Sequence, residues 1–140
     1  MKKLLLIVLP LLLIVGCEDE KAETEQVDPL VGVWDMTSAS ILVQSNPSTT
    51  ITITKDADNF ETMILGEDGT YSYSGKMNGE ADSGSGSWSS TANKLTIIED
   101  GETTIIDFSI SGSTLTTSVT NAETDTNWGS VITIIYNKTS

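Results

Sequence analysis

The residue types that most often carry enzymatic chemistry are scarce in this sequence. Its 140 residues include no histidine and a single cysteine, Cys17. Serine is abundant, but a serine or cysteine nucleophile usually depends on a histidine as its general base. A zinc ion would have to be bound by carboxylates alone, which is unusual for structural and catalytic sites. We therefore expect a protein that is not an enzyme, with no cofactor and no metal.

One group of oxygen-bearing side chains lies close together in the middle of the chain. Asp56, Asp58, Asn59 and Glu61 fall within six residues, beside an expected turn. Alternating carboxylates can bind calcium, but an EF-hand loop needs a longer series of ligands and a glycine at its sixth position. A solvated acidic loop is the simpler interpretation of these four residues.

The segment 79–87 is rich in glycine and serine, a composition that is typical of flexible segments. A phosphate-binding loop would place such glycines at the start of a helix, usually together with a lysine. Here a strand, not a helix, is expected to follow at Trp88. The segment is therefore predicted to be a flexible loop at the mouth of a β structure.

The charge of the chain limits the partners that it can have. Twenty acidic residues against seven lysines give a formal net charge of −13, and there is no arginine. Such a charge repels nucleic-acid backbones and anionic lipid head groups. We expect no nucleic-acid partner, and any membrane affinity must come from another source than surface charge.

The N-terminal residues have the pattern of a targeting segment. Lys2 and Lys3 precede a run from Leu4 to Val15 that is apolar apart from Pro10. This run is short for a transmembrane helix, which needs about 20 apolar residues. It is followed by Gly16 and Cys17, and the last four residues of this segment, Ile-Val-Gly-Cys, resemble the lipobox of bacterial lipoproteins.

The resemblance implies that residues 1–16 are a signal peptide, cleaved after Gly16, and that Cys17 carries the lipid, palmitate included. Stable anchoring takes two or more acyl chains, which a fully modified cysteine supplies. Residues 17–28 are then the lipidated cysteine and a flexible acidic linker. We expect an outer-membrane lipoprotein of the cell envelope, on its periplasmic or cell-surface face. A cleaved signal with a chance cysteine and a short uncleaved anchor are the alternatives.

Residues 29–140 form one domain whose hydropathy pattern has a period of two residues and almost no helical signal. Threonine and isoleucine dominate the alternating runs, and β-branched residues suit a pleated sheet with one solvated face. Turn signals lie between the runs, among them Asp68-Gly69, Ala92-Asn93, Asp100-Gly101 and Gly112-Ser113. The alternating runs are 50–54, 70–74, 94–98, 104–110, 115–119 and 128–136.

Eight or nine strands joined mostly by hairpins favour an antiparallel up-and-down meander. Closure of such a sheet into a barrel removes its free edges. We predict an all-β fold, a small antiparallel barrel of about eight strands, with a β-sandwich as the alternative.

Short motifs of this domain resemble those of small bacterial lipocalin-like lipoproteins. Gly32 and Trp34 form the G-x-W motif of the strand that opens lipocalin-like and related calycin domains. In lipocalins this tryptophan packs at the closed end of the barrel beneath an arginine of the last strand. The chain has no arginine, and Lys138 is the only basic residue placed to substitute for it. The segments 67–71, 86–89, 93–97 and 134–138 resemble later parts of the same domains.

The resemblance implies an apolar ligand cavity inside the barrel. Its lining is indicated by aromatic and apolar side chains that alternate in phase along the strands. The alternative is a filled core, because an eight-stranded barrel can be just wide enough for its own side chains. A cavity favours a non-catalytic binding module for a small apolar or amphipathic ligand. A filled core favours a structural or interaction protein of the envelope, with an unknown protein partner. The residues expected to face the interior are Trp34, Met36, Ile53, Tyr71, Tyr73, Trp88, Ile97, Phe108 and Ile134.

Overall fold

The computed structural model describes residues 27–124 and 128–140, which contain nine strands. The predicted signal peptide, its cleavage after Gly16 and the lipidation of Cys17 lie outside these residues. Within them, no helix of sufficient length and apolarity to cross a membrane is present. The strands are β1 (Gly32–Val43), β2 (Thr49–Thr54), β3 (Phe60–Leu65), β4 (Thr70–Met77), β5 (Glu80–Thr91), β6 (Lys94–Glu99), β7 (Glu102–Ser111), β8 (Thr114–Asn121) and β9 (Ser130–Lys138).

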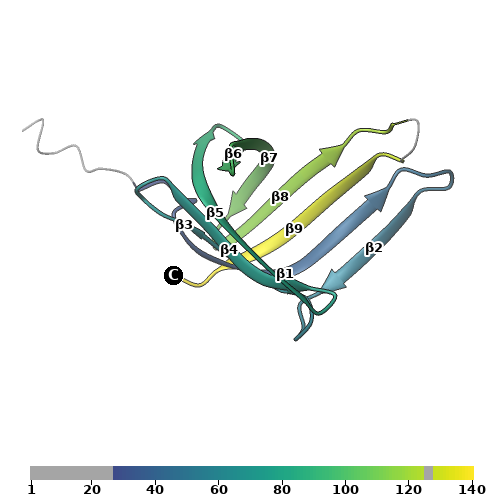
Figure 1. Cartoon of the computed structure of the whole chain (residues 1–140), viewed down its shortest axis with the longest axis horizontal. Coiled ribbons are helices and arrows are strands. Elements are labelled where there is room, and N and C mark those ends of the chain that lie inside the picture. Colours follow the sequence, from purple (N-terminus) through teal and green to yellow (C-terminus); the bar gives the residue numbers. More distant parts are fainter. Residues whose placement is uncertain (1–26, 125–127) are drawn as a thin grey trace, which may run out of the picture.

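All nine strands belong to one antiparallel sheet that closes on itself (Figure 1). Each strand from β3 to β8 pairs with the next, and β9 pairs with β1 along most of its length. The first part of β1, residues 32–35, pairs with β3 and completes the circle. The strands β1 and β3–β9 therefore form a closed eight-stranded barrel, with β2 as an extra strand. This confirms the prediction of an all-β barrel, and the alternative of a sandwich was wrong.

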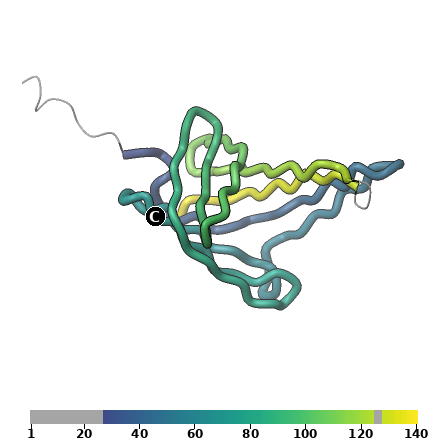
Figure 2. The backbone as a smooth tube through the Cα atoms, turned by 45° about the horizontal axis from the view of Figure 1, so that its top comes forward, coloured from purple at the N-terminus to yellow at the C-terminus, as the bar shows by residue number. Residues whose placement is uncertain are grey.

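A β-bulge in β1 changes which strand pairs with one edge of β1. The register shifts between Met36 and Ser38, and beyond it residues 38–43 pair with β2 instead of β3. As a result β2, β1, β9 and β8 continue together as a long arm on one side of the barrel (Figures 1 and 2). Ile53 at the base of the arm is half-buried, whereas Ile51 further along is 50% exposed. The apolar inner face of the barrel thus continues onto the arm and becomes accessible there.

The hairpin turns follow the predicted turn signals. Asp100 and Gly101 have φ angles of 51° and 82°, and Ala92 and Gly112 have φ angles of 47° and 59°. Asparagine, aspartate and glycine tolerate positive φ better than other residues, and the two-residue turns of β hairpins require it. The structure confirms the turns predicted at these positions.

The prediction of a flexible loop over residues 79–87 was wrong. Asn78 and Gly79, with φ angles of 53° and 80°, form the turn, and residues 80–87 belong to β5. On the inner face of the sheet, Tyr71 lies opposite Gly86 and Tyr73 lies opposite Gly84. A Cβ atom at Gly86 would overlap the carbonyl oxygen of Ile98 on β6. The glycines therefore permit close approach of strands and tyrosine rings, which composition alone does not distinguish from flexibility.

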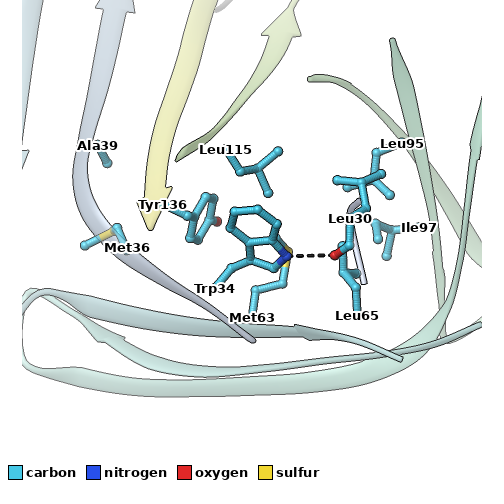
Figure 3. Packing of buried hydrophobic residues seen from close by; sticks show 10 residues of the cluster. All are labelled: Leu30, Trp34, Met36, Ala39, Met63, Leu65, Leu95, Ile97, Leu115 and Tyr136. Atoms are coloured by element: carbon cyan, nitrogen blue, oxygen red, sulfur yellow. Dashed lines mark hydrogen bonds between the residues drawn. The ribbon is translucent and has the colours of Figure 1, made fainter. Parts of the chain in front are cut away.

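The core fills one end of the barrel around Trp34, as Figure 3 shows. The indole of Trp34 is fully buried, and its Nε1–H donates a hydrogen bond of 2.7 Å to the carbonyl oxygen of Leu30. The segment before β1 thus folds across this end of the barrel and closes it. The buried apolar residues are Leu30, Trp34, Met36, Ala39, Met63, Leu65, Leu95, Ile97, Leu115 and Tyr136.

Candidate functional site in the barrel interior

The closed end of the barrel is held by contacts between the two ends of the domain. Lys138 Nζ lies 5.3 Å from the centre of the Trp34 ring and donates a hydrogen bond of 3.2 Å to the carbonyl oxygen of Pro29. The lysine thus occupies the place that the resemblance to lipocalins implied for it. Asp28 accepts hydrogen bonds of 2.9 Å from Leu30 N–H and from the Ser90 hydroxyl. Asp28, which the sequence pattern assigned to the linker, therefore makes hydrogen bonds with the domain.

A cavity of about 180 Å³ lies inside the barrel next to this core. Its walls come from β3, β4, β6, β7, β8 and β9, so that strands from all around the barrel contribute to it. Most of the lining is apolar, which suits an apolar ligand group. The lining residues are Glu61, Met63, Tyr71, Leu95, Ile97, Ile106, Thr117, Val119, Ile132, Ile134 and Tyr136.

The carboxylate of Glu61 is the one acidic group among the residues that line this cavity. The alternation of β3 places Glu61 on the same inward face as the buried Met63 and Leu65. The Tyr136 hydroxyl donates a hydrogen bond of 2.6 Å to Glu61 Oε1. Burial raises the pKa of Glu61 above its ordinary value of 4.5, the Tyr136 hydrogen bond opposes this, and the nearby negative charge of Asp82 adds to the rise.

The same environment changes the pKa of the two tyrosines that line the cavity. Burial, followed by the negative charge of Glu61, raises the pKa of both Tyr71 and Tyr136. Both hydroxyls therefore stay protonated at neutral pH and can act as hydrogen-bond donors. Tyr136 already donates to Glu61, so this hydroxyl fixes the position of the carboxylate.

Two further carboxylates lie on the inner face of the sheet beyond Glu61. The Tyr73 hydroxyl donates a hydrogen bond of 3.2 Å to Asp82 Oδ2, and the rings of Tyr71 and Tyr73 are 5.8 Å apart. Glu99 lies two residues after the cavity-lining Ile97 on β6, and its carboxylate lies beside Gly84, so it faces inward as well. The lysines that form ion pairs in residues 27–124 and 128–140 bind Asp35 and Asp107, so none of these pairs neutralises the inner carboxylates.

The nine residues predicted to face the interior occupy three different positions. Tyr71, Ile97 and Ile134 line the cavity. Trp34 and Met36 are fully buried in the core, and Tyr73 is half-buried on the inner face beside Tyr71. A role in ligand binding stays a prediction for all of them. The remaining three, Ile53, Trp88 and Phe108, are half-buried and pack against the core.

The acidic segment 56–61 separates into two parts with different roles. Asp56 Oδ1 accepts hydrogen bonds of 2.8 Å from the backbone N–H groups of Asp58 and Asn59, and these bonds lower the pKa of Asp56. This carboxylate stabilises the turn before β3. In the part of the chain that the structure describes, no group of three or more histidine, cysteine or acidic residues is arranged to hold a metal ion.

Glu61 does not belong to that turn, and grouping it with the acidic loop was wrong. It is the second residue of β3 and faces the interior. The signal that could have identified it is its period-two spacing with Met63 and Leu65, which are both buried.

Two shallower hollows lie elsewhere on the domain. One of about 380 Å³ lies between Val27, Val31 and Trp88 near the closed end. The other, of about 410 Å³, lies along Phe60 and Lys76 beside the β4–β5 hairpin. Neither hollow is surrounded by strands from all sides of the barrel, so the interior cavity is the stronger candidate for a site.

Comparison with known proteins agrees with this architecture. Neither a curated protein nor a solved structure matches the chain. The family of lipocalin-like domains matches residues 30–117, which is more than half of the chain. The matched region runs from the segment that closes the barrel to the middle of β8 and includes Trp34, Glu61 and Tyr71. The chain therefore belongs to the lipocalin-like domain family.

Proposed function

We propose that this chain is a non-catalytic binding module whose barrel takes a small apolar or amphipathic ligand, held at a membrane by lipid on Cys17. The observation that carries the binding role is the mostly apolar cavity of about 180 Å³ lined by residues of six strands. Membership of the lipocalin-like family supports it, because such barrels are suited to hold one small ligand.

The size of the cavity limits the ligand. An apolar cavity of about 150 Å³ is large enough to bind benzene, whereas pockets for drug-sized molecules occupy about 300–1,000 Å³. A cavity of about 180 Å³ therefore fits one ring or a short branched chain with a small polar group. The polar groups of Glu61 and Thr117 are on its wall and would orient such a ligand.

A pair of variants on β8 tests the binding role. Val119 lines the cavity, whereas Thr120 next to it is exposed. Titration calorimetry with 2-phenylethanol should show saturable binding to the unmodified domain. Val119→Phe should weaken that binding at least tenfold because the added ring fills the cavity, and Thr120→Phe should leave it unchanged. Binding to Val119→Phe that equals binding to the unmodified domain would exclude the cavity as the site.

A structural or interaction role in the envelope is the second candidate. The observation that favours it is the exposure of isoleucines on the outer face, with Ile105 at 61% and Ile98 at 44%. These two residues lie on the paired strands β6 and β7. If the barrel acts through this face, replacing both by threonine should abolish co-purification of an envelope protein, and Val119→Phe should not.

The anchoring proposal is supported by the sequence before the domain. The single cysteine follows Gly16 and a short apolar run, and the chain has a net charge of −13. A chain of this charge gains no attraction from an anionic membrane surface, so covalent lipid is the physical means that would hold it there. We place the protein at the outer membrane, on the periplasmic or the cell-surface face.

A further inference from the structure

Building on the proposed binding function, we propose that the ligand is a cation: a small aryl-alkyl or alkyl ammonium whose charge pairs with Glu61 and whose apolar part fills the cavity.

The Glu61 carboxylate has surroundings that favour a cation. It lies in the wall of an apolar cavity and accepts a hydrogen bond from Tyr136 through Oε1. The ion pairs found within residues 27–124 and 128–140 do not include it. The Glu61 carboxylate is half-buried, and partial removal of a charge from water without a counter-ion carries a free-energy cost. A cation with its own hydrogen-bond donors would relieve this cost. An ammonium group on the ligand supplies both the charge and the donors.

The groups around Glu61 add further negative charge or neutral hydrogen-bond donors. Tyr136 on β9 and Thr117 on β8 present hydroxyls, and Tyr71 on β4 presents a ring and a hydroxyl. Asp82 on β5 and Glu99 on β6 lie on the inner face beyond them. The pKa of Tyr71 is raised by burial and then by the charges of Glu61 and Glu99. The potential at this end of the cavity is therefore negative.

Aromatic rings lie beside these carboxylates. Tyr71 lines the cavity, and the ring of Tyr73 lies 5.8 Å from it. Tyrosine faces attract an ammonium group within about 6 Å of the ring centre. Carboxylates next to tyrosine rings therefore suit a cation with an apolar group, and they disfavour an anionic ligand such as a fatty acid.

Three probes that share a phenyl ring and differ in their polar group test the charge preference. They are 2-phenylethylamine, 2-phenylethanol and 3-phenylpropionate, each titrated into the unmodified domain at neutral pH. The amine should bind at least tenfold more tightly than the alcohol, and the propionate should bind more weakly than the alcohol. This comparison needs no variant and therefore does not depend on the folding of one.

Two matched variants assign the preference to Glu61. Glu61→Gln removes the charge and keeps the shape, so it should abolish the preference for the amine over the alcohol. Glu102→Gln removes one charge at an exposed position of β7 and should keep the full preference for the amine. Retention of that preference by Glu61→Gln would overturn the assignment to this residue.

The outcomes separate the two proposals. Equal binding of amine and alcohol would overturn the cation proposal and leave the binding module intact. Tighter binding of the propionate would overturn it as well. Failure of all three probes to bind would overturn the cation proposal together with the cavity as a binding site.

Discussion

Glu61 shows how the position of a carboxyl group in a small barrel can change its pKa. Asp56 and Asp58, a few residues before it, are exposed to solvent, yet the carboxyl of Glu61 lies in the cavity wall beside Tyr136. Because burial raises its pKa above 4.5, the folded state favours the protonated form more than the unfolded state does. This difference couples the stability of the domain to pH.

The sign of that coupling leads to the first prediction. A raised pKa in the folded state means that ionised Glu61 lowers the free energy of unfolding at neutral pH. This is a stability penalty. It declines as pH falls through the folded-state pKa, and it is absent below the unfolded value. Glu61→Gln should therefore increase the free energy of unfolding at pH 7, with a melting temperature a few degrees higher, and the gain should shrink on acidification. Urea denaturation at pH 7 and pH 4 measures both effects, with Glu102→Gln as the control. A variant less stable than the parent at pH 7 would contradict this account.

Lys138 gives the second prediction at this scale. Its ammonium group lies over the Trp34 ring and donates to the carbonyl oxygen of Pro29. Lys138→Met keeps an apolar side chain of similar length but removes both interactions, and we expect it to lower the free energy of unfolding by about 1 kcal/mol. Lys138→Arg should retain most of the stability because guanidinium also stacks on aromatic rings. Equal stability of the Met and Arg variants in urea denaturation would argue against a role for the charge.

Among the elements, β5 depends on the absence of side chains. A Cβ atom at Gly86 would overlap the backbone of Ile98, while Ser85 is exposed on the other face. Gly86→Ala should therefore destabilise the domain by about 1–3 kcal/mol through overpacking, and Ser85→Ala should change stability by less than about 0.5 kcal/mol. Thermal unfolding of the two variants provides the measurement. If both variants melt together, β5 is not packed as described.

The sequence predicts those strands whose own residues alternate between apolar and polar or are bounded by turn residues. Alternating threonine and isoleucine identify β2 and β9, and Asp-Gly identifies the turn between β6 and β7. The glycines and serines of β5 have no such pattern, and pairing with β4 and β6 determines its conformation. The bulge in β1 and the change of partner beyond it also depend on tertiary pairing. Local composition contains neither kind of information.

The site was predictable to a similar extent. The phase of apolar residues placed Ile97 and Ile134 inside the barrel, and both line the cavity. Trp34 and Met36 were in the correct phase, but they fill the closed end, and phase does not give the height of a residue along the barrel axis. The sequence did not identify Glu61 as an interior residue, because carboxylates are mostly exposed. Its partner across the barrel, Tyr136, becomes apparent only in the folded structure.

The whole molecule combines a closed end, a small cavity and an arm. The core around Trp34 fills the closed end (Figure 3). Strands β1, β2, β8 and β9 extend beyond it as the arm (Figure 1). Ile53 and Ile51 of β2 continue the apolar inner face onto the arm. The partial exposure of Ile51 shows that this face is accessible to solvent on the arm. A ligand can therefore approach the cavity along an apolar surface.

At this scale the anchor gives a fourth prediction. In cells that make the full chain, Cys17→Ser should abolish labelling by a lipid precursor and move the protein from the membrane fraction to the soluble fraction. No other thiol in the chain can accept the lipid, and the charge of −13 provides no attraction to anionic membranes. Membrane extraction with detergent and with high salt serves as the control. Continued labelling of the serine variant would contradict lipidation at Cys17.

The central claim is that the interior cavity binds a small ligand, and methyl NMR tests it most directly. Among the isoleucines, an inward group lines the cavity, Ile97, Ile106, Ile132 and Ile134, and an outward group is exposed, Ile64, Ile98 and Ile105. The domain, labelled at isoleucine methyl groups, would be titrated with 2-phenylethanol. The account predicts saturable shifts of the inward methyl signals with the outward ones unchanged. Inward signals that stay unchanged, or shifts confined to the outward group, would contradict it.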